Sequence, residues 1–265
     1  EKTGIDGIEI GFACPMGEGQ DIIAGDPERV YAYTCEVVKA VHVPVSVKLS
    51  AAVGNLSAVV EAAGKAGASG ISGIDTLRCI LKIDIESGKP DLPTYGGYSG
   101  APIRPIGLAT IASIAQCTDL PVIGMGGIEN YENLIEYIMA GASAGGIGTA
   151  ILLHGYDVVT QTIQHLETWM QAHSIKSIEE IRGRALPELY SFEEIKRDMK
   201  QVKLIKEQNG ASCTKCRKCI DCCLHNAISS PEDPEAPIQI HESLCDGCGL
   251  CVSVCPERKL ILCRL

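Results

Sequence analysis

Short apolar runs alternate with mixed segments through the first 153 residues of the chain. Each apolar run is followed by glycine or polar residues, a pattern that is typical of strands in α/β proteins. We predict strands at Ile5–Gly11, Val43–Leu49, Ala68–Ile74, Pro121–Gly124 and Ala144–Thr149. We predict helices from Asp26 to about Val41, from about Leu56 to Ala66, at Gly107–Cys117 and at Asn130–Ala140. The segment from Leu77 to Arg104 is rich in Gly and Pro and is predicted to be a long loop.

Strands that alternate with helices predict parallel βα units. Five such units in a row, with glycine or polar residues after each strand, favour part of a (β/α)₈ TIM barrel. A doubly wound open sheet would show the same alternation, so the pattern alone does not separate the two folds. The first helix has a clear start signal, because Asp26, Pro27 and Glu28 supply a cap, a proline at the first position and an acid in the first turn.

Three segments are predicted along the 265 residues. Residues 1–155 form the barrel-like part, residues 156–210 form a helical connector, and residues 211–265 form a small α+β domain. Helices are predicted in the connector at Tyr156–Ala172, Ile178–Arg182 and Phe192–Gln208, and Gly210 ends it.

Composition and charge narrow the possible functions. Hydrophobic residues make up 46% of the chain, which is enough for a packed core. The net charge of −10 argues against binding nucleic acid or anionic lipid through bulk charge. The longest weakly polar run, Ile138 to Leu153, is 16 residues long and too short to span a bilayer comfortably. No signal peptide is recognised, so we expect a cytoplasmic protein whose cysteines stay reduced and bind metal.

Cysteine is concentrated at the C-terminal end, where ten of the 14 cysteines lie between Cys213 and Cys263. Two runs of the form C-x₂-C-x₂-C-x₃-C are present, Cys213–Cys223 and Cys245–Cys255, and Pro256 follows the second. This spacing is typical of bacterial ferredoxins with two [4Fe–4S] clusters, in which the fourth cysteine of each run binds the other cluster. The predicted ligands are Cys213, Cys216, Cys219 and Cys255 for one cluster, and Cys245, Cys248, Cys251 and Cys223 for the other.

The alternative is a pair of zinc sites. Zinc usually takes four ligands in two separated pairs, and two complete runs exceed that requirement. Leu224 stands where proline would normally follow the first run, a small departure. Cys222 and Cys263 are surplus to both runs; they are interpreted as small buried hydrophobes, with an alternative ligand role left open for Cys222.

Glycines and a lysine at predicted strand ends suggest a second site. Gly126-Gly127 and Gly148-Thr149 follow two strands, where barrel enzymes often bind phosphate through bare backbone N–H groups. Two ordinary glycine turns would look the same. Lys48 ends a buried strand, so its ammonium group must meet an anion, reach a cleft or extend to solvent.

Motifs along nearly the whole chain resemble the C-terminal part of dihydropyrimidine dehydrogenase and the bacterial iron–sulfur/FMN subunit of that enzyme, whose barrel is shared with dihydroorotate dehydrogenase. The matching stretches, in the family's order, are GIEIGFACP (7–15), VKL (47–49), TYGGYSGAPIRP (94–105), GMGGI (124–128), GTA (148–150), KSIEE (176–180) and both cysteine runs.

This resemblance implies an FMN site. It places the phosphate on Gly126, Gly127, Gly148 and Thr149, and Lys48 at the N1/O2 edge of the flavin, with Ser99 and Gly100 against it. It also makes Cys14 the catalytic acid that exchanges a proton with a substrate carbon, whereas a lone cysteine is otherwise most often a buried hydrophobe.

The substrate positions depart from the family pattern. The family has asparagine three residues before the catalytic cysteine and again after the sixth strand, and here these positions are Gly11 and Asp75, followed by the matching Thr76. Glycine offers no side chain, and an ionised carboxylate only accepts hydrogen bonds. Uracil and thymine are therefore in doubt as substrates.

The resemblance also implies that three βα units precede Glu1 in the family's barrel, so we expect further polypeptide or another chain, and an oligomer. The function implied is an FMN-dependent oxidoreductase subunit. It would pass electrons between the ferredoxin domain and FMN to reduce or oxidise a C=C/C–C bond of a dihydropyrimidine-like or related small substrate. The partner implied is an NAD(P)H-oxidising flavoprotein. The alternative is an electron-transfer subunit of a larger redox complex without pyrimidine chemistry.

Overall fold

A computed structural model describes residues 3–12, 23–191, 193–194, 200–205, 213–232 and 237–264 of the chain. The chain divides into two compact units, Glu1–Leu189 and Tyr190–Leu265. Within the part of the chain that the structure describes, no helix has the length and apolar character needed to cross a bilayer.

A five-stranded parallel sheet forms the centre of the first unit, and its strands lie in the order β1-β2-β3-β6-β7. These strands are β1 (Ile8–Gly11), β2 (Val45–Leu49), β3 (Gly70–Gly73), β6 (Val122–Met125) and β7 (Ala144–Gly146). Neighbours in the sheet follow the order of the chain, so successive βα units all step in one direction. A doubly wound sheet reverses this direction at a switch point, and the observed order is that of a barrel arc.

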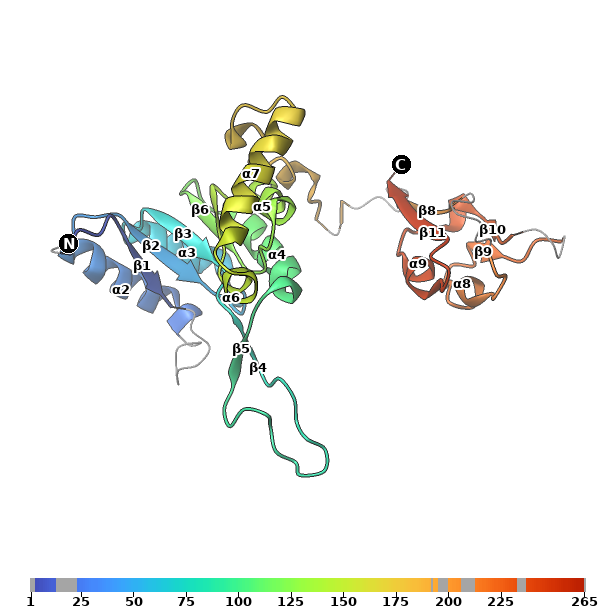
Figure 1. Cartoon of the computed structure of the whole chain (residues 1–265), viewed down its shortest axis with the longest axis horizontal. Helices are drawn as coiled ribbons and strands as arrows, with labels where there is room; N and C mark the ends of the chain where they lie inside the picture. Colours follow the sequence, from blue (N-terminus) through green and yellow to red (C-terminus); the bar gives the residue numbers. More distant parts are fainter. Residues whose placement is uncertain are drawn as a thin grey trace. The chain divides into compact units, whose positions relative to one another are not determined.

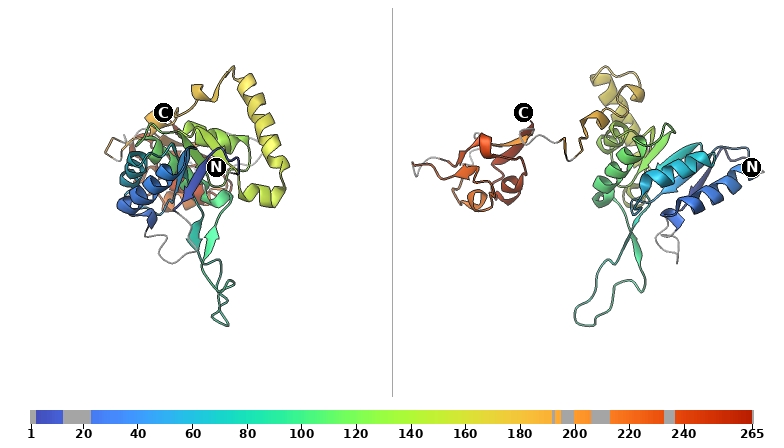
Figure 2. Two further views of the ribbon diagram at one scale, coloured as in Figure 1. Left: turned by 90° about the vertical axis from the view of Figure 1, so that its left-hand side faces the viewer. Right: turned by 180° about the vertical axis from the view of Figure 1, so that it is seen from behind.

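Helices cover one face of this sheet, as Figures 1 and 2 show. They are α2 (Pro27–Ala40), α3 (Leu56–Lys65), α4 (Arg104–Ala115), α5 (Tyr131–Met139) and α7 (Asp157–Ala172), whereas α6 (Thr149–His154) begins just beyond the carboxyl end of β7. Helix α2 contacts α3, α3 contacts α4, and α4 contacts α5. Helix α7 packs on both α5 and α6. The cap predicted for α2 is confirmed, because the Asp26 carboxylate accepts the backbone N–H of Glu28 at 3.0 Å and of Arg29 at 3.2 Å.

Side chains of β2 show how the sheet separates core from site. Val45, Val47 and Leu49 are fully buried, and the last two belong to the main core cluster with residues of α2 and α3. Ser46 and Lys48 alternate with them and lie on the opposite face of the sheet, because side chains along a strand alternate between faces. The face away from the helices therefore carries polar groups.

The segment predicted as a loop between Leu77 and Arg104 contains a β-hairpin. Strands β4 (Leu77–Cys79) and β5 (Gly96–Tyr98) pair antiparallel, and a bridge joins Ile83 to Pro90 further along the arm. This arm projects from the first unit in Figures 1 and 2. A 3-10 turn, Ala101–Ile103, then leads into α4, and two more, Ile178–Glu180 and Leu186–Glu188, follow α7.

The second unit is built on strand β8 (Lys200–Leu204), which pairs antiparallel with β11 (Leu260–Arg264). The helix predicted over residues 192–208 is therefore wrong at residues 200–204. These residues belong to a strand whose partner lies near the end of the chain, and Val202 and Leu260 of the two strands are buried in one core cluster. The remaining elements are α8 (Lys218–Asp221), β9 (Ile228–Ser229), β10 (Gln239–Ile240), a 3-10 turn (Glu242–Leu244) and α9 (Leu250–Val254).

Candidate functional site

A cavity of about 270 Å³ opens at the carboxyl ends of strands β2, β3, β6 and β7. It is lined by Lys48, Ile74, Asp75, Thr76, Ser99, Gly100, Ile103, Met125, Gly126, Gly127, Gly146, Ile147, Gly148 and Thr149. All seven residues that the sequence assigned to a cofactor are among them, together with Asp75 and Thr76. The structure thus brings together four separate sequence motifs at the end of the sheet where barrel enzymes place their sites.

Glycine backbones form the wall of this cavity. Gly127 has a φ of +74°, and a Cβ atom there would lie 2.7 Å from the carbonyl oxygen of Gly100. Gly100 in turn lies next to Thr149, since a Cβ on Gly100 would come within 3.5 Å of the Thr149 methyl group. Three turns that are distant in sequence therefore pack closely, and at Gly127 the space is too small for any side chain.

Gly148 differs from these glycines. A Cβ atom there would meet no atom within 4 Å, although Gly148 lines the cavity. The glycine thus leaves open space in the cavity that a side chain would fill. Gly148 precedes α6, whose first backbone N–H groups have no partner within the helix. This combination of free space and backbone donors fits a phosphate-bearing cofactor.

Tyr137 of α5 supports the glycine turn from behind, and sequence reasoning missed it. Its side chain is fully buried, and its hydroxyl donates to the Gly126 carbonyl oxygen at 2.7 Å. The Met125 carbonyl oxygen lies 3.3 Å from the same hydroxyl. Burial raises the pKa of Tyr137 well above its ordinary value, so this phenol stays protonated as a donor. Nothing in the sequence pattern of α5 distinguishes Tyr137 from an ordinary core residue.

Lys48 is held at the cavity by two carboxylates. Its Nζ lies 3.3 Å from an Asp75 carboxylate oxygen and 3.7 Å from a Glu9 carboxylate oxygen. Glu9 also accepts a hydrogen bond of 2.6 Å from the hydroxyl of the fully buried Ser72. Two acids therefore surround one cation on the polar face of the sheet. Sequence reasoning identified Lys48 and Asp75, but it missed Glu9 and Ser72, which come from neighbouring strands.

The structure describes the three predicted substrate residues, Gly11, Asp75 and Thr76, but not the predicted catalytic cysteine. Gly11 ends β1 in register with Lys48, and a Cβ atom on it would meet nothing within 4 Å. Asp75 fixes its own loop by accepting the Thr76 backbone N–H at 2.7 Å. Cys14, the predicted catalytic acid, lies outside the described residues, and its role stays a prediction.

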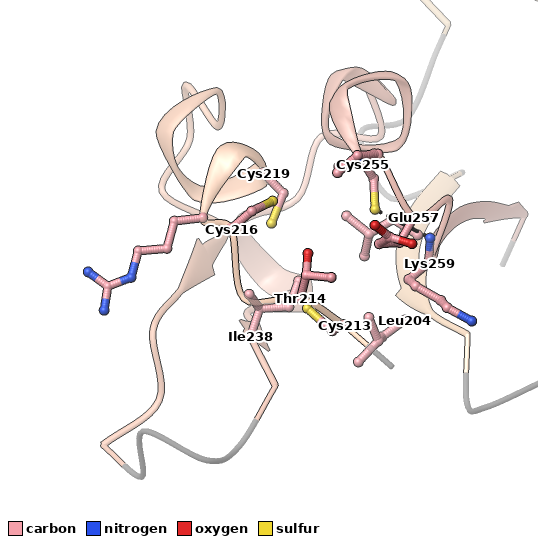
Figure 3. A pocket seen from close by; sticks show the side chains of 12 residues that line it. Leu204, Cys213, Thr214, Cys216, Cys219, Ile238, Cys255, Glu257 and Lys259 are labelled. Carbon is pink, nitrogen blue, oxygen red and sulfur yellow. Dashed lines mark hydrogen bonds between the residues drawn. The ribbon is translucent and has the colours of Figure 1, made fainter. Parts of the chain in front are cut away.

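Cysteines line two cavities in the second unit. The first is lined by Cys213, Cys216, Cys219 and Cys255, and their labelled side chains surround one space in Figure 3. The second is lined by Cys222, Cys223, Cys245, Cys248 and Cys251. The fourth cysteine of each run thus reaches the cavity of the other run, as the spacing predicted. Among the described residues, no three candidate ligands converge closely enough to bind a single metal ion.

The two halves of this unit repeat each other with a shift of 32 residues. Cys213, Cys216, Cys219 and Cys223 correspond to Cys245, Cys248, Cys251 and Cys255. The backbone repeats as well. The Ala227 N–H donates to Cys223 Sγ at 3.3 Å, and the Lys259 N–H donates to Cys255 Sγ at the same distance. Both crossing thiols therefore receive the same backbone hydrogen bond, a contact that tunes iron–sulfur potentials.

Burial makes these thiols difficult to ionise without positive charge nearby. Cys219 and Cys251 are both buried, and burial is the main cause that raises the pKa of Cys219 and brings the pKa of Cys251 to about 11. Neighbouring cysteines raise both values further. A donor set of four thiols around one cavity fits an iron–sulfur cluster, because the iron ions supply the compensating charge.

Comparison with known proteins gives two family matches. A family model described as "Dihydroorotate dehydrogenase" matches residues 3–170. A second, described as "4Fe-4S dicluster domain", matches residues 212–259. The cysteine runs and the βα units thus match two separate models.

Curated relatives are similar to the first unit. The dihydroorotate dehydrogenase B (NAD(+)) catalytic subunit of Thermococcus kodakarensis is 38% identical over 183 residues, which cover 68% of this chain and 60% of the relative. The subunit of the same name from Streptococcus pneumoniae is 39% identical over 186 residues, covering 69% and 59%. The chain spans about 60% of the length of these relatives.

A solved structure shares the fold. DHODH from Eimeria tenella, crystallised with ferulenol, matches with a TM-score of 0.58 at 18% identity, covering 68% of this chain and 54% of that one. The likeness confirms the predicted barrel-type fold for the first unit.

Proposed function

This chain belongs to the dihydroorotate dehydrogenase family, and we propose that it is an iron–sulfur flavoprotein that exchanges electrons between two [4Fe–4S] clusters and FMN. The predicted resemblance to dihydropyrimidine dehydrogenase involves the same type of flavin-binding barrel. The comparisons with known proteins support the dihydroorotate dehydrogenase family and not dihydropyrimidine dehydrogenase. One observation carries the proposal: the residues assigned to FMN line one cavity, and the eight cysteines divide into two sets of four.

The first cavity suits FMN in its walls and in its charge. Gly126, Gly127, Gly148 and Thr149 would hold the phosphate through backbone N–H groups. Lys48 would face the pyrimidine edge of the flavin ring, with Ser99 and Gly100 beside the ring. When bound, FMN supplies the exchange between single-electron carriers and a two-electron hydride step.

The residues around Lys48 orient its ammonium group. Glu9 and Asp75 hold the Lys48 Nζ from two sides, and the Ser72 hydroxyl fixes Glu9. The lysine is thereby kept at the cavity wall instead of extending to solvent. Cys14 is proposed to hold the proton that a substrate carbon exchanges, which is acid–base work that a thiol can perform near neutral pH.

The cysteines of the second unit are proposed to bind two clusters in the crossed arrangement. Cys213, Cys216, Cys219 and Cys255 would hold one cluster, and Cys245, Cys248, Cys251 and Cys223 the other. Cys222 also lines the second cavity, but its Sγ lies 3.5 Å from the Cys219 carbonyl oxygen and is engaged there.

The reaction we propose is reduction or oxidation of a C=C/C–C bond in a dihydropyrimidine-like or related small molecule. The site lacks amide side chains at Gly11 and Asp75, and the Asp75 carboxylate is paired with Lys48. These two features favour a second candidate as well, an electron-transfer subunit of a larger redox complex whose substrate is not a pyrimidine. An NAD(P)H-oxidising flavoprotein is the proposed electron partner. The name of the relatives, dihydroorotate dehydrogenase B (NAD(+)) catalytic subunit, supports an NAD-linked partner.

Purified protein tests the proposal directly. We expect flavin absorption bands together with a broad iron–sulfur shoulder, and iron and acid-labile sulfide in the amounts of two [4Fe–4S] clusters. A colourless protein that binds zinc would contradict it.

Turnover separates the two candidate functions. Uracil, orotate and other activated alkenes would be compared as electron acceptors from the chemically reduced, loaded protein. Cys14→Ala is expected to abolish turnover while FMN stays bound, and Cys35→Ala, on the outer helix α2, serves as the matched control. Turnover that persists in Cys14→Ala would exclude the acid role of Cys14.

A further inference from the structure

The loops that run between the first and third cysteines of the two repeats carry opposite charge. The first loop reads CTKCRKC (213–219) and the second reads CDGCGLC (245–251). Three cations, Lys215, Arg217 and Lys218, therefore stand where the second loop has one acid, Asp246, and no cation. We call residues 214–218 the cationic loop.

The backbone of the cationic loop carries these cations at a conformational cost. Lys215 and Arg217 have φ values of +53° and +62°, and the equivalent residues of the second loop are Gly247 and Gly249, both at +74°. Glycine is the residue that adopts this left-handed region without strain, and side chains there are costly. Side chains placed in this strained region, where the second loop has glycine, favour a function for those side chains.

Exposure also distinguishes the two loops. Residues 214–218 are all exposed. In the second loop Asp246, Gly247 and Gly249 are half-buried, and a Cβ atom on Gly247 would lie 2.6 Å from the Lys200 carbonyl oxygen of β8. Arg217 also lines the first cysteine cavity. The first cavity is thus bordered by the exposed Arg217, with the exposed Glu257 also on its lining, and the second loop is packed against a strand.

We propose that the cationic loop is the docking surface for an acidic one-electron carrier protein, which exchanges electrons with the cluster of Cys213, Cys216, Cys219 and Cys255. This inference rests on the proposed iron–sulfur function. In the step, the reduced carrier loses one electron and this cluster gains it, with no bond made or broken and no proton moved. The unit that carries the loop has 11 Lys or Arg and 11 Asp or Glu residues, so its formal net charge is zero. The overall charge of this unit therefore does not offset the positive potential at the cationic loop.

The test uses the full chain loaded with FMN and clusters, and an acidic plant-type [2Fe–2S] ferredoxin as the reduced donor. Lys215→Gly combined with Arg217→Gly gives the first loop the glycines of the second. We expect stopped-flow measurements to show a second-order rate constant about tenfold lower at low salt, with a weaker salt dependence. Methyl viologen radical, a small cation, should reduce the same variant at the wild-type rate or faster.

Lys200→Glu is the matched control, because it makes the same change of two charge units beside the second loop. We expect less than a twofold effect with ferredoxin. An unchanged ferredoxin rate in the double glycine variant, an equal loss in Lys200→Glu, or an equal loss with methyl viologen would overturn the docking proposal. The electron paramagnetic resonance spectrum of the reduced wild-type protein reports separately on the proposed function, because it shows whether the clusters form at all.

Discussion

The cavity of the first unit and the cysteine cavities of the second are built by opposite means. In the first unit, glycine backbones from strand ends that are distant in sequence pack closely around Gly127. In the second, sulfur atoms at fixed local spacing line the cavities, and a short helix lies within each run and carries its third cysteine. A backbone site depends on the whole sheet being in register, whereas a thiol site depends mainly on its own side chains.

Replacing a thiol should therefore have the largest and most local effect. Cys219→Ala removes a buried ligand from the first cavity, and we expect the protein to lose about half of its iron while FMN is retained. Cys222→Ala is the control, since Cys222 lies three residues away and is surplus to both sets. Iron and flavin analysis of both variants checks this. Loss of FMN from Cys219→Ala would contradict the expectation that the two kinds of cavity depend on separate features of the chain.

Gly127→Ala should damage the backbone site through the fold. The new Cβ would meet the Gly100 carbonyl oxygen, and alanine is strained at a φ of +74°, so we expect a loss of about 2 kcal/mol or more in stability and no FMN binding. Gly148→Ala sharpens the test, because its Cβ meets no atom within 4 Å and its φ of −120° lies outside the left-handed region. We expect that variant to melt at the wild-type temperature but to retain less FMN. Equal melting temperatures for both variants would contradict this account.

Tyr137→Phe should produce a smaller effect of the same kind. The substitution removes the hydroxyl that donates to the buried Gly126 carbonyl oxygen, and we expect destabilisation of about 1–3 kcal/mol in urea unfolding. FMN should also dissociate faster, because the glycine turn loses its support. Tyr31→Phe, on an exposed position of α2, provides the control. A Tyr137→Phe protein with unchanged FMN release would show that the turn holds its shape without this hydrogen bond.

Asp75→Asn should change specificity with little effect on the fold. An asparagine offers both a donor and an acceptor, which a cyclic amide needs, and it releases Lys48 from one of its two ion pairs. We expect turnover of uracil or orotate, relative to a non-amide alkene, to rise by about threefold to tenfold. Glu9→Gln is the control for the loss of charge alone. An unchanged ratio would argue that Asp75 does not face the substrate.

Much of the first unit follows from sequence because its elements are short and locally marked. The Asp26 cap, the strand at Val45–Leu49 and the glycines after β6 all have the predicted places. Lys200–Leu204 was missed because strand pairing with Leu260–Arg264 joins residues far apart in the chain, and the basic run resembled a helix face. The hairpin arm was likewise read as a loop, since its two strands are only three residues long.

The two candidate sites also differ in how far the sequence alone predicts them. Cysteine spacing identified both thiol sets without knowledge of the fold, because the ligands are local in sequence. The grouping of Lys48, Asp75, Gly100, Gly127 and Gly148 needed a family resemblance, since only the sheet brings them together. The sequence did not predict roles for Tyr137, Glu9 and Ser72, because these roles come from contacts between elements and produce no recognisable spacing of residues.

The exchange of Cys223 and Cys255 between the two halves makes assembly of this unit a joint event. Neither half supplies four sulfurs to one cavity by itself, so a polypeptide that stopped before Cys255 would offer only three to the first. With the proposed crossed ligands, the first cluster could be completed only after the second half has been synthesised and has folded back. Oxidation of one crossing cysteine would then weaken one cluster and also disturb the segment that helps to hold the other, so the two clusters would be gained and lost together.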